Sequence, residues 1–182
     1  MNLKRVSSPS KFLFSKNVGI FLLLAVVLFL LVSKRVVSYE TSAPLATQDI
    51  NRDFSFPLND SHGGEIGSIQ YTIEKAELRD EIIVKGSRAA AAPGRAFIVL
   101  SIKITNDFKQ AVSVNTKDYV RLSVNGDTSE VVAPEIHNDP VEVQAISTKS
   151  TKVGFPVNTN DKEISLWVGE LNAEKERIDL SI

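Results

Sequence analysis

The sequence of 182 residues contains no cysteine, one methionine, one tryptophan and two histidines. Without cysteine, the chain has no disulfide bonds, no thiolate metal ligands and no lipobox cysteine for a lipid anchor. Any folded part must therefore be stabilised by a hydrophobic core. The net charge of −1 at pH 7 is close to zero, so the composition gives no reason to expect a nucleic acid partner.

Motifs for catalysis are lacking as well. The histidines, His62 and His137, lie 75 positions apart and belong to no recognisable metal or triad motif. The chain has no Gly-x-Ser-x-Gly elbow and no glycine-rich phosphate-binding loop. Asn and Asp gather at expected loop tips, as turns require, and no cluster matches a compact calcium loop, although loops converging at one end of a sandwich could bind calcium. The sequence therefore predicts no catalytic, cofactor-binding or metal-binding residue.

One long apolar run, VGIFLLLAVVLFLLV, covers residues 18–32. A helix of this run would be about 22 Å long, which is short of the roughly 30 Å hydrocarbon core of a bilayer. Residues 33–37 extend it to a spanning length, because Lys34 and Arg35 can place their charged ends among the lipid headgroups. Residues 17–37 are therefore predicted to form a transmembrane signal anchor. Its principal residues are Val18, Leu22, Leu24, Val27, Leu30, Val32, Lys34 and Arg35.

The charges on either side of the run predict its orientation. Residues 1–16 carry four basic side chains and no acidic one. Lys and Arg are enriched on the cytoplasmic side of membrane segments. We therefore expect residues 1–16 to be a cytoplasmic tail of a single-pass cell membrane protein, with the C-terminal part outside the cytoplasm. The alternative is a cleaved signal peptide and a secreted product, which Lys34 and Arg35 disfavour because they occupy the cleavage region.

Residues 38–64 are rich in Ser, Thr, Asn, Asp, Pro and Gly. This composition is typical of a flexible linker. Phe54 and Phe56 are the exception, because alternating aromatic residues are unusual in a free coil. As an alternative, they form a short edge strand of the following domain.

Residues 65–182 show the period of two that is typical of β-strands. Strands are expected over residues 69–73, 81–85, 95–105, 111–114, 119–124, 128–132, 141–146, 152–157, 163–168 and 177–182. Asn125-Gly126 predicts a hairpin turn, and residues 87–94 are expected to form a loop. Short strands separated by turn signals indicate an all-β, antiparallel two-sheet sandwich.

Several segments of this region carry a resemblance. They are GRAFIVLSIKITND at residues 94–107, KSTKVGFPV at 149–157 and EIGSIQYTIEKAEL at 65–78. Together they resemble a widespread bacterial family of extracytoplasmic immunoglobulin-like domains of unknown function, which is similar in fold to a small secreted mycobacterial antigen. The resemblance implies an immunoglobulin-like β-sandwich outside the cytoplasm, and it supplies no catalytic residues.

These observations favour a non-enzymatic binding or protein-interaction module that is tethered to the membrane. The partner would be the membrane itself through the anchor, together with another envelope protein or a surface polymer. The alternative is a hydrolase or metal-dependent enzyme whose site assembles from distant loops. That alternative requires acidic loop residues to converge in a pocket and to have perturbed pKa values.

Overall fold

The computed structural model describes residues 42–59, 64–84 and 87–182. The predicted basic tail (residues 1–16) and signal anchor (residues 17–37) lie outside the described residues, so both stay predictions. Within the described residues, no helix is long and apolar enough to cross a membrane.

The described chain folds mainly into antiparallel β-strands, which confirms the predicted all-β class. Its elements are β1 (Ala46–Asn59), β2 (Glu65–Arg79), β3 (Glu81–Val84), β4 (Ser87–Ala90), β5 (Arg95–Asn106), β6 (Val112–Val114), the 3₁₀ turn η1 (Thr116–Asp118), β7 (Val120–Ser123), β8 (Val141–Val143), β9 (Ser147–Asn158), β10 (Ile164–Val168) and β11 (Glu176–Leu180).

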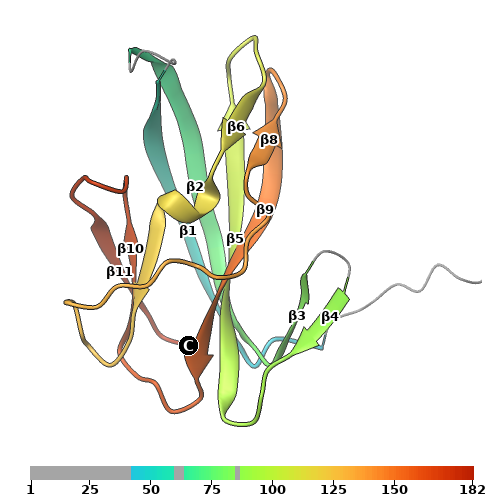
Figure 1. Ribbon diagram of the computed structural model, residues 1–182, viewed down its shortest axis with the longest axis vertical. Coiled ribbons are helices and arrows are strands. Elements are labelled where there is room, and N and C mark those ends of the chain that lie inside the picture. Colours follow the sequence, from blue (N-terminus) through green and yellow to red (C-terminus); the bar gives the residue numbers. More distant parts are fainter. Residues whose placement is uncertain (1–41, 60–63, 85–86) are drawn as a thin grey trace, which may run out of the picture. The chain divides into compact units, whose positions relative to one another are not determined.

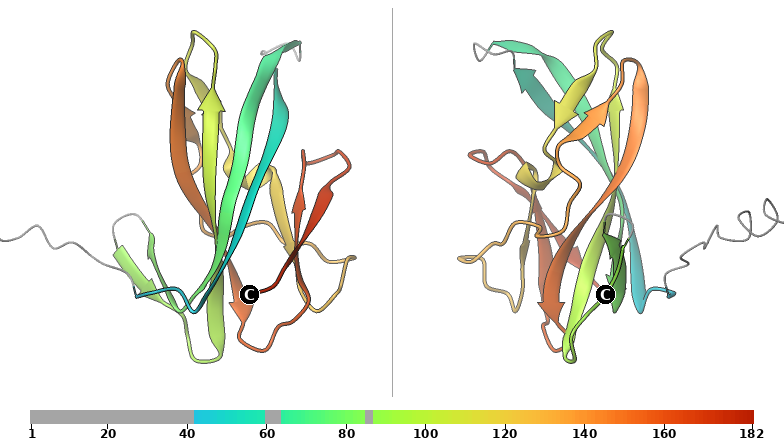
Figure 2. Two further views of the ribbon diagram at one scale, coloured as in Figure 1. Left: turned by 180° about the vertical axis from the view of Figure 1, so that it is seen from behind. Right: turned by 45° about the vertical axis from the view of Figure 1, so that its right-hand side comes forward.

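Two sheets provide most of the core (Figure 1). The larger sheet has the strand order β1-β2-β5-β9, and the smaller one has the order β11-β10-β7. Two further strand pairs, β3–β4 and β6–β8, complete the fold. Figure 2 shows the long strands of the larger sheet from behind, with the shorter strands of the smaller sheet on the other side.

β5 shows the period of two most clearly. Its even-numbered residues Ala96, Ile98, Leu100, Ile102 and Ile104 are completely buried. Each large aliphatic side chain among them contributes roughly 1.5–3 kcal/mol by leaving water. On the other face of the strand, Val99 is also buried. The first half of β5 is therefore covered on both faces.

β2 contains one extra residue relative to β5. Ile73 lies opposite Ile102, and Lys75 then lies opposite Ser101. Since side chains alternate along a strand, this bulge reverses which residues face the core. Ile73 before the bulge and Ala76 after it are both completely buried. Lys75 and the following odd-numbered residues of β2 consequently lie on the outer face of the sheet.

The prediction of a flexible linker over residues 38–64 is wrong for residues 46–59, which form β1 along β2. Phe56 is buried, and its ring centroid lies 4.2 Å from that of Tyr119. The alternative expectation, an edge strand at Phe54 and Phe56, is confirmed. The folded domain therefore begins well before residue 65.

An irregularity in β1 explains why its pattern resembles a linker. Asn51 has a φ of +48°, and the register with β2 shifts between Asp49 and Arg52. The shift changes which face the side chains occupy, so the strand shows no continuous alternation of apolar and polar residues.

Two smaller predictions also fail. Residues 87–90, expected in a loop, form β4 and pair with β3. The turn at Asn125-Gly126 is present, with φ values of +57° and +68°. The predicted returning strand over residues 128–132 is reduced to a single antiparallel bridge, in which Val132 and Leu122 of β7 exchange two backbone hydrogen bonds (2.8 and 2.9 Å). β7 also pairs with β10. The Asn125 side chain connects this turn to the segment before β10: it donates to Asp161 (3.1 Å) and accepts from the Lys162 backbone N–H (3.0 Å).

The turn between β8 and β9 contains a strained residue. Ile146 has a φ of +50°, and its exposed fraction is 65%. The left-handed conformation costs a non-glycine residue roughly 1–2 kcal/mol, and β-branched side chains tolerate it poorly. Little apolar burial offsets this cost, because most of the side chain faces solvent.

We predict that Ile146→Asn increases the free energy of unfolding by about 1 kcal/mol, because Asn tolerates this conformation. Urea unfolding monitored by circular dichroism measures the change. Ile146→Val is the matched control and should give no increase, since it keeps a β-branched side chain. A loss of stability in the Asn variant would mean that the Ile146 side chain makes contacts outweighing the backbone strain.

Candidate functional site

A pocket of about 200 Å³ lies where the β3–β4 pair meets β5 and β9. Its apolar lining comes from Ile82, Ile83, Val99, Ile136 and Val153. Its polar lining consists of Arg79, Glu81, His137, Asn138 and Lys152. We refer to this cavity as the inner pocket. An apolar lining with a few polar groups is the usual character of a ligand-binding site.

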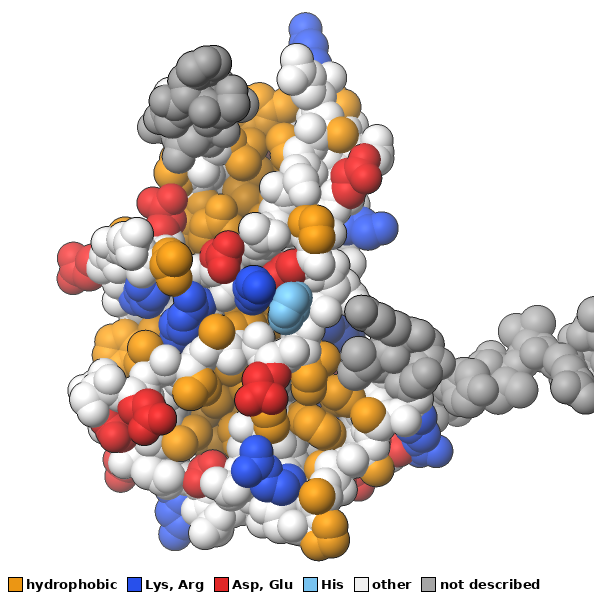
Figure 3. All heavy atoms as spheres, in the orientation of Figure 1, with side chains coloured by type: hydrophobic (Ala, Val, Ile, Leu, Met, Phe, Trp, Pro, Cys, Tyr) orange, Lys and Arg blue, Asp and Glu red, His pale blue; other side chains and the backbone are white. Residues whose placement is uncertain are grey.

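A second depression, of about 450 Å³, continues from the inner pocket along β9. The two share Ile83, Asn138 and Lys152. One wall is formed by residues 149–152 of β9, and the opposite wall by Asn138 and residues 140–142. We refer to this depression as the β9 groove. Figure 3 shows that charged and apolar side chains are interspersed over one face of the domain.

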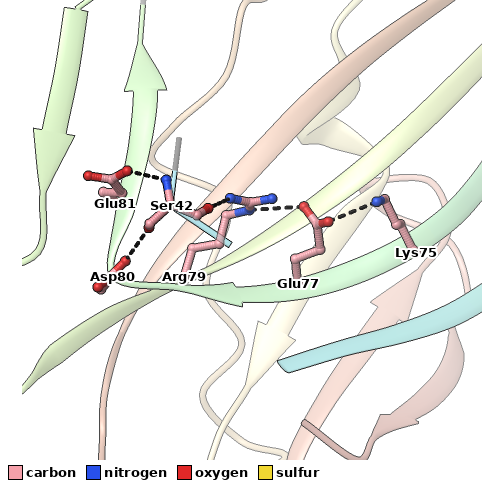
Figure 4. Close-up of polar contacts among 6 residues, drawn as sticks. All are labelled: Ser42, Lys75, Glu77, Arg79, Asp80 and Glu81. Carbon is pink, nitrogen blue, oxygen red and sulfur yellow. Dashed lines mark hydrogen bonds and ion pairs between the residues drawn. The ribbon is translucent and has the colours of Figure 1, made fainter. Parts of the chain in front are cut away.

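A row of alternating charges runs along the end of β2 towards the inner pocket. The Glu77 carboxylate accepts from Lys75 Nζ (2.8 Å) and from Arg79 Nε (3.0 Å) (Figure 4). Glu77 is only 2% exposed. The three residues share one face because they are spaced by two on a strand, and the bulge at Ile73 places that face outward.

The row continues to the first described residue of the chain. Arg79 Nη1 donates to the Ser42 carbonyl oxygen (2.8 Å), and Ser42 Oγ donates to Asp80 (2.9 Å) (Figure 4). The Ser42 backbone N–H donates to Glu81, which also accepts from the Arg88 guanidinium. These contacts fix the start of the described chain at the corner between β2 and β3, beside the inner pocket.

Both carboxylates of this network are held in the ionised form. Burial raises the pKa of Glu77, but the hydrogen bonds and charges of Arg79 and Lys75 outweigh it and lower the pKa to about 2. Hydrogen bonds from Arg88 and from the Ser42 backbone lower the pKa of Glu81 to about 2. A general acid requires the opposite shift. The two carboxylates therefore act as hydrogen-bond acceptors that hold Arg79, Arg88 and Ser42 in place beside the pocket.

His137 contributes an imidazole to the inner pocket. Its Nδ1 accepts from the Asp139 backbone N–H (3.3 Å) and lies 3.4 Å from the Asp139 carboxylate. That carboxylate accepts from the Thr116 backbone N–H (2.8 Å) and hydroxyl (2.6 Å) and from the Lys117 N–H (2.9 Å). Asp139 therefore fixes the start of η1. Its hydrogen-bonding capacity is largely used there.

The Asn- and Asp-rich loops partly converge, as the calcium alternative requires. Asp161 accepts from the Asn125 side chain and from the Asn158 backbone N–H (2.8 Å). These contacts are hydrogen bonds between turns. Among the described residues, no group of three or more His, Cys, Asp or Glu side chains is arranged to hold a metal ion. His62 lies outside the described residues.

The predicted membrane-anchor residues, from Val18 to Arg35, all lie outside the described residues. The row of Lys75, Glu77 and Arg79 was not predicted from the sequence. The signal was available, because alternating opposite charges at a spacing of two on a predicted strand indicate one shared face. The sequence does not show that these residues lie on the outer face of the sheet, because that depends on the bulge between Ile73 and Lys75.

Neither a family model nor a curated protein matches the chain. Among solved structures, it is similar to a conserved hypothetical protein from Bacillus anthracis, with a TM-score of 0.51 and 15% identity over 76% of this chain and 99% of that one. It is also similar to an uncharacterized β-sandwich protein from Clostridium difficile 630, with a TM-score of 0.50 and 14% identity over 74% of this chain and 98% of that one. These likenesses show the fold alone, and they confirm a β-sandwich.

The buried carboxylate leads to a pH-dependent prediction. Because the folded-state pKa of Glu77 lies below its ordinary value of 4.5, its stabilising effect is complete above about pH 5 and is lost as the pH falls towards 2. We predict that Glu77→Gln lowers the free energy of unfolding by about 2–3 kcal/mol at pH 7 and by much less at pH 3. Urea unfolding at both pH values measures this difference.

Glu74→Gln is the matched control for this measurement. Glu74 is half-buried on the same strand and has no ion pair among the described residues. Its variant should therefore change the free energy of unfolding little at either pH. Equal effects of the two substitutions would contradict the role assigned to Glu77.

Proposed function

We propose that the chain is a membrane-tethered, non-enzymatic binding module of the extracytoplasmic space. Its β-sandwich, of the immunoglobulin-like type, presents the inner pocket and the β9 groove to another envelope protein or a surface polymer. The proposed tether is the signal anchor of residues 17–37, and the basic residues 1–16 support its orientation.

The observation that carries the proposal is the continuity of the inner pocket with the β9 groove. The shared residues Ile83, Asn138 and Lys152 join a small, mostly apolar cavity to a longer open depression. Such a combination suits an extended ligand that inserts one apolar group and lies along the groove. The Ser42 contacts fix the first described residue at the β2–β3 corner, and the groove extends along β9 from the pocket beside that corner.

The ionisation of the carboxylates supports binding over catalysis. Hydrogen bonds from Ser129 lower the pKa of Asp127. Burial raises the pKa of Asp161, but hydrogen bonds from Asn158 and Asn125 outweigh this effect and lower it. A hydrolase that uses a carboxyl group as its proton donor needs the pKa of that carboxyl to be raised. The clearly perturbed carboxyls among the described residues shift in the other direction.

The proposed location predicts that the C-terminal domain is accessible from outside the cytoplasm. Protease added to intact cells should digest the domain, detected through a C-terminal epitope tag, while a cytoplasmic marker survives. In cells with an outer membrane, the same test is made after that membrane is opened, with a periplasmic marker as reference. Digestion only after lysis of the cytoplasmic membrane would overturn the orientation. A shortened product in the medium would instead support cleavage and secretion.

The proposed binding surface predicts a site-specific partner. A photo-reactive amino acid at Ile83 in the β9 groove should give a discrete cross-linked adduct in intact cells. Leu171 is the matched control, because it is also an exposed aliphatic residue and does not line the groove. The exposed fraction is 57% for Leu171 and 41% for Ile83. The absence of any adduct at Ile83, or identical adducts at both positions, would count against the groove as the binding surface.

A further inference from the structure

β9 is an edge strand with an open side. One side pairs with β5 along its whole length. On the other side, Gly154 exchanges two backbone hydrogen bonds with Ile136, at 2.7 and 3.1 Å. Backbone groups point to alternate sides along a strand, so the N–H and C=O of Lys152, Ser150 and Thr148 point in the same direction as those of Gly154. Within the described residues, these groups have no backbone partner on that side.

The other edge of the same sheet is treated differently. In β1, Gln48 donates from Nε2 to the Asp179 carbonyl oxygen (3.3 Å) and accepts from the Ser181 N–H (2.6 Å). Arg52 pairs with Glu176 of β11. The edge of β1 is therefore tied to the C-terminal strand by side chains. The edge of β9, by contrast, faces the β9 groove.

The groove has the form of a slot for a single extended chain. Residues 149–152 of β9 form one wall, and Asn138 and residues 140–142 form the opposite wall; Ile83 also lines the groove. An incoming strand would find the backbone groups of Lys152 and Ser150 on one side. The opposite wall restricts the space available to the edge of another folded sheet, so the shape favours a single chain.

The charges of the groove favour acidic side chains. Lys149 and Lys152 are exposed on β9, and Lys103 lies opposite Ser150 on β5. None of these three lysines has an ion pair among the described residues. On the acidic side, Glu142 lies in the opposite wall, while Glu81 of the inner pocket is already paired with Arg88.

From these observations we infer that β9 binds an extended, acidic peptide segment of a partner protein, which adds a strand along residues 148–152. Backbone hydrogen bonds supply the affinity in this mode, and alternate side chains supply the specificity. The inference rests on the proposed binding function and names the chemistry of the partner. Lysines on an open edge also discourage unwanted pairing, and the experiment separates this simpler role from binding.

The test uses the full-length chain in mild detergent and a short synthetic peptide in which glutamate alternates with valine. One control peptide has lysine in place of glutamate, and another is N-methylated at alternate residues, which removes backbone donors. We expect the acidic peptide to bind at least about tenfold more tightly than the lysine peptide, a difference of about 1.4 kcal/mol. The N-methylated peptide should not bind measurably. Isothermal titration calorimetry gives the affinities.

Two variants locate the binding on β9. Ser150→Pro removes the outward N–H without breaking a bond to β5, because the backbone groups of Ser150 point away from that strand. It should weaken peptide binding at least about tenfold, whereas Ser150→Ala should bind like the unmodified chain. Hydrogen exchange on the unmodified chain gives a second test that needs no variant. The amides of Ser150 and Lys152 should exchange quickly in the free protein and slowly with the acidic peptide.

Equal binding of all peptides, or no protection of the Ser150 amide, would overturn the inference. The lysines would then serve only to prevent unwanted pairing at the open edge. Slow exchange in the free monomer would mean that the chain itself covers the edge. Slow exchange of these amides only under conditions where the protein is dimeric would mean that a second copy of the chain covers the edge. Either result would also overturn the inference. A specific adduct at Ile83 in cells would still support the broader binding function. Absence of both signals would remove both proposals.

Discussion

A single extra residue in β2 determines how the outer face of the larger sheet is built. Before the bulge, Ile69, Tyr71 and Ile73 face the core; after it, Ala76 does. Without the insertion, the odd-numbered residues Lys75 and Glu77 would point into the hydrophobic interior. Burying two charges there would cost several kcal/mol per ion. The bulge therefore allows one strand to contribute first to the core and then to a charged outer face.

The charged row formed in this way organises the neighbouring pocket. Breaking a buried pair leaves an uncompensated charge, which costs far more than an exposed pair contributes. Glu77 therefore constrains Arg79, and Arg79 in turn holds the Ser42 carbonyl oxygen. The same corner carries Glu81, which lines the inner pocket. The same contacts thus set the position of Ser42 and the shape of the pocket.

Much of the fold was predictable from the sequence because most core strands keep a strict period of two. β5 is the clearest case, since a strand was predicted over residues 95–105 and its alternate residues from Ile98 to Ile104 are completely buried. β1 was assigned to a linker because the irregularity at Asn51 interrupts its alternation. The hairpin after Asn125 was predicted only in part. Its turn is present, but the returning segment pairs with β7 at a single bridge, between Leu122 and Val132, and not along a strand.

The candidate site was less predictable, because it depends on register and on which edge stays open. The sequence shows Lys149 and Lys152 in a strand, but it does not show that this strand lies at an edge of its sheet. It also gives no sign that β1, at the opposite edge, is tied to β11 through Gln48. Glu81, the acidic residue that lines the inner pocket, already forms an ion pair with Arg88. In the proposed binding mode, selectivity in the β9 groove comes from the lysines and the backbone of β9.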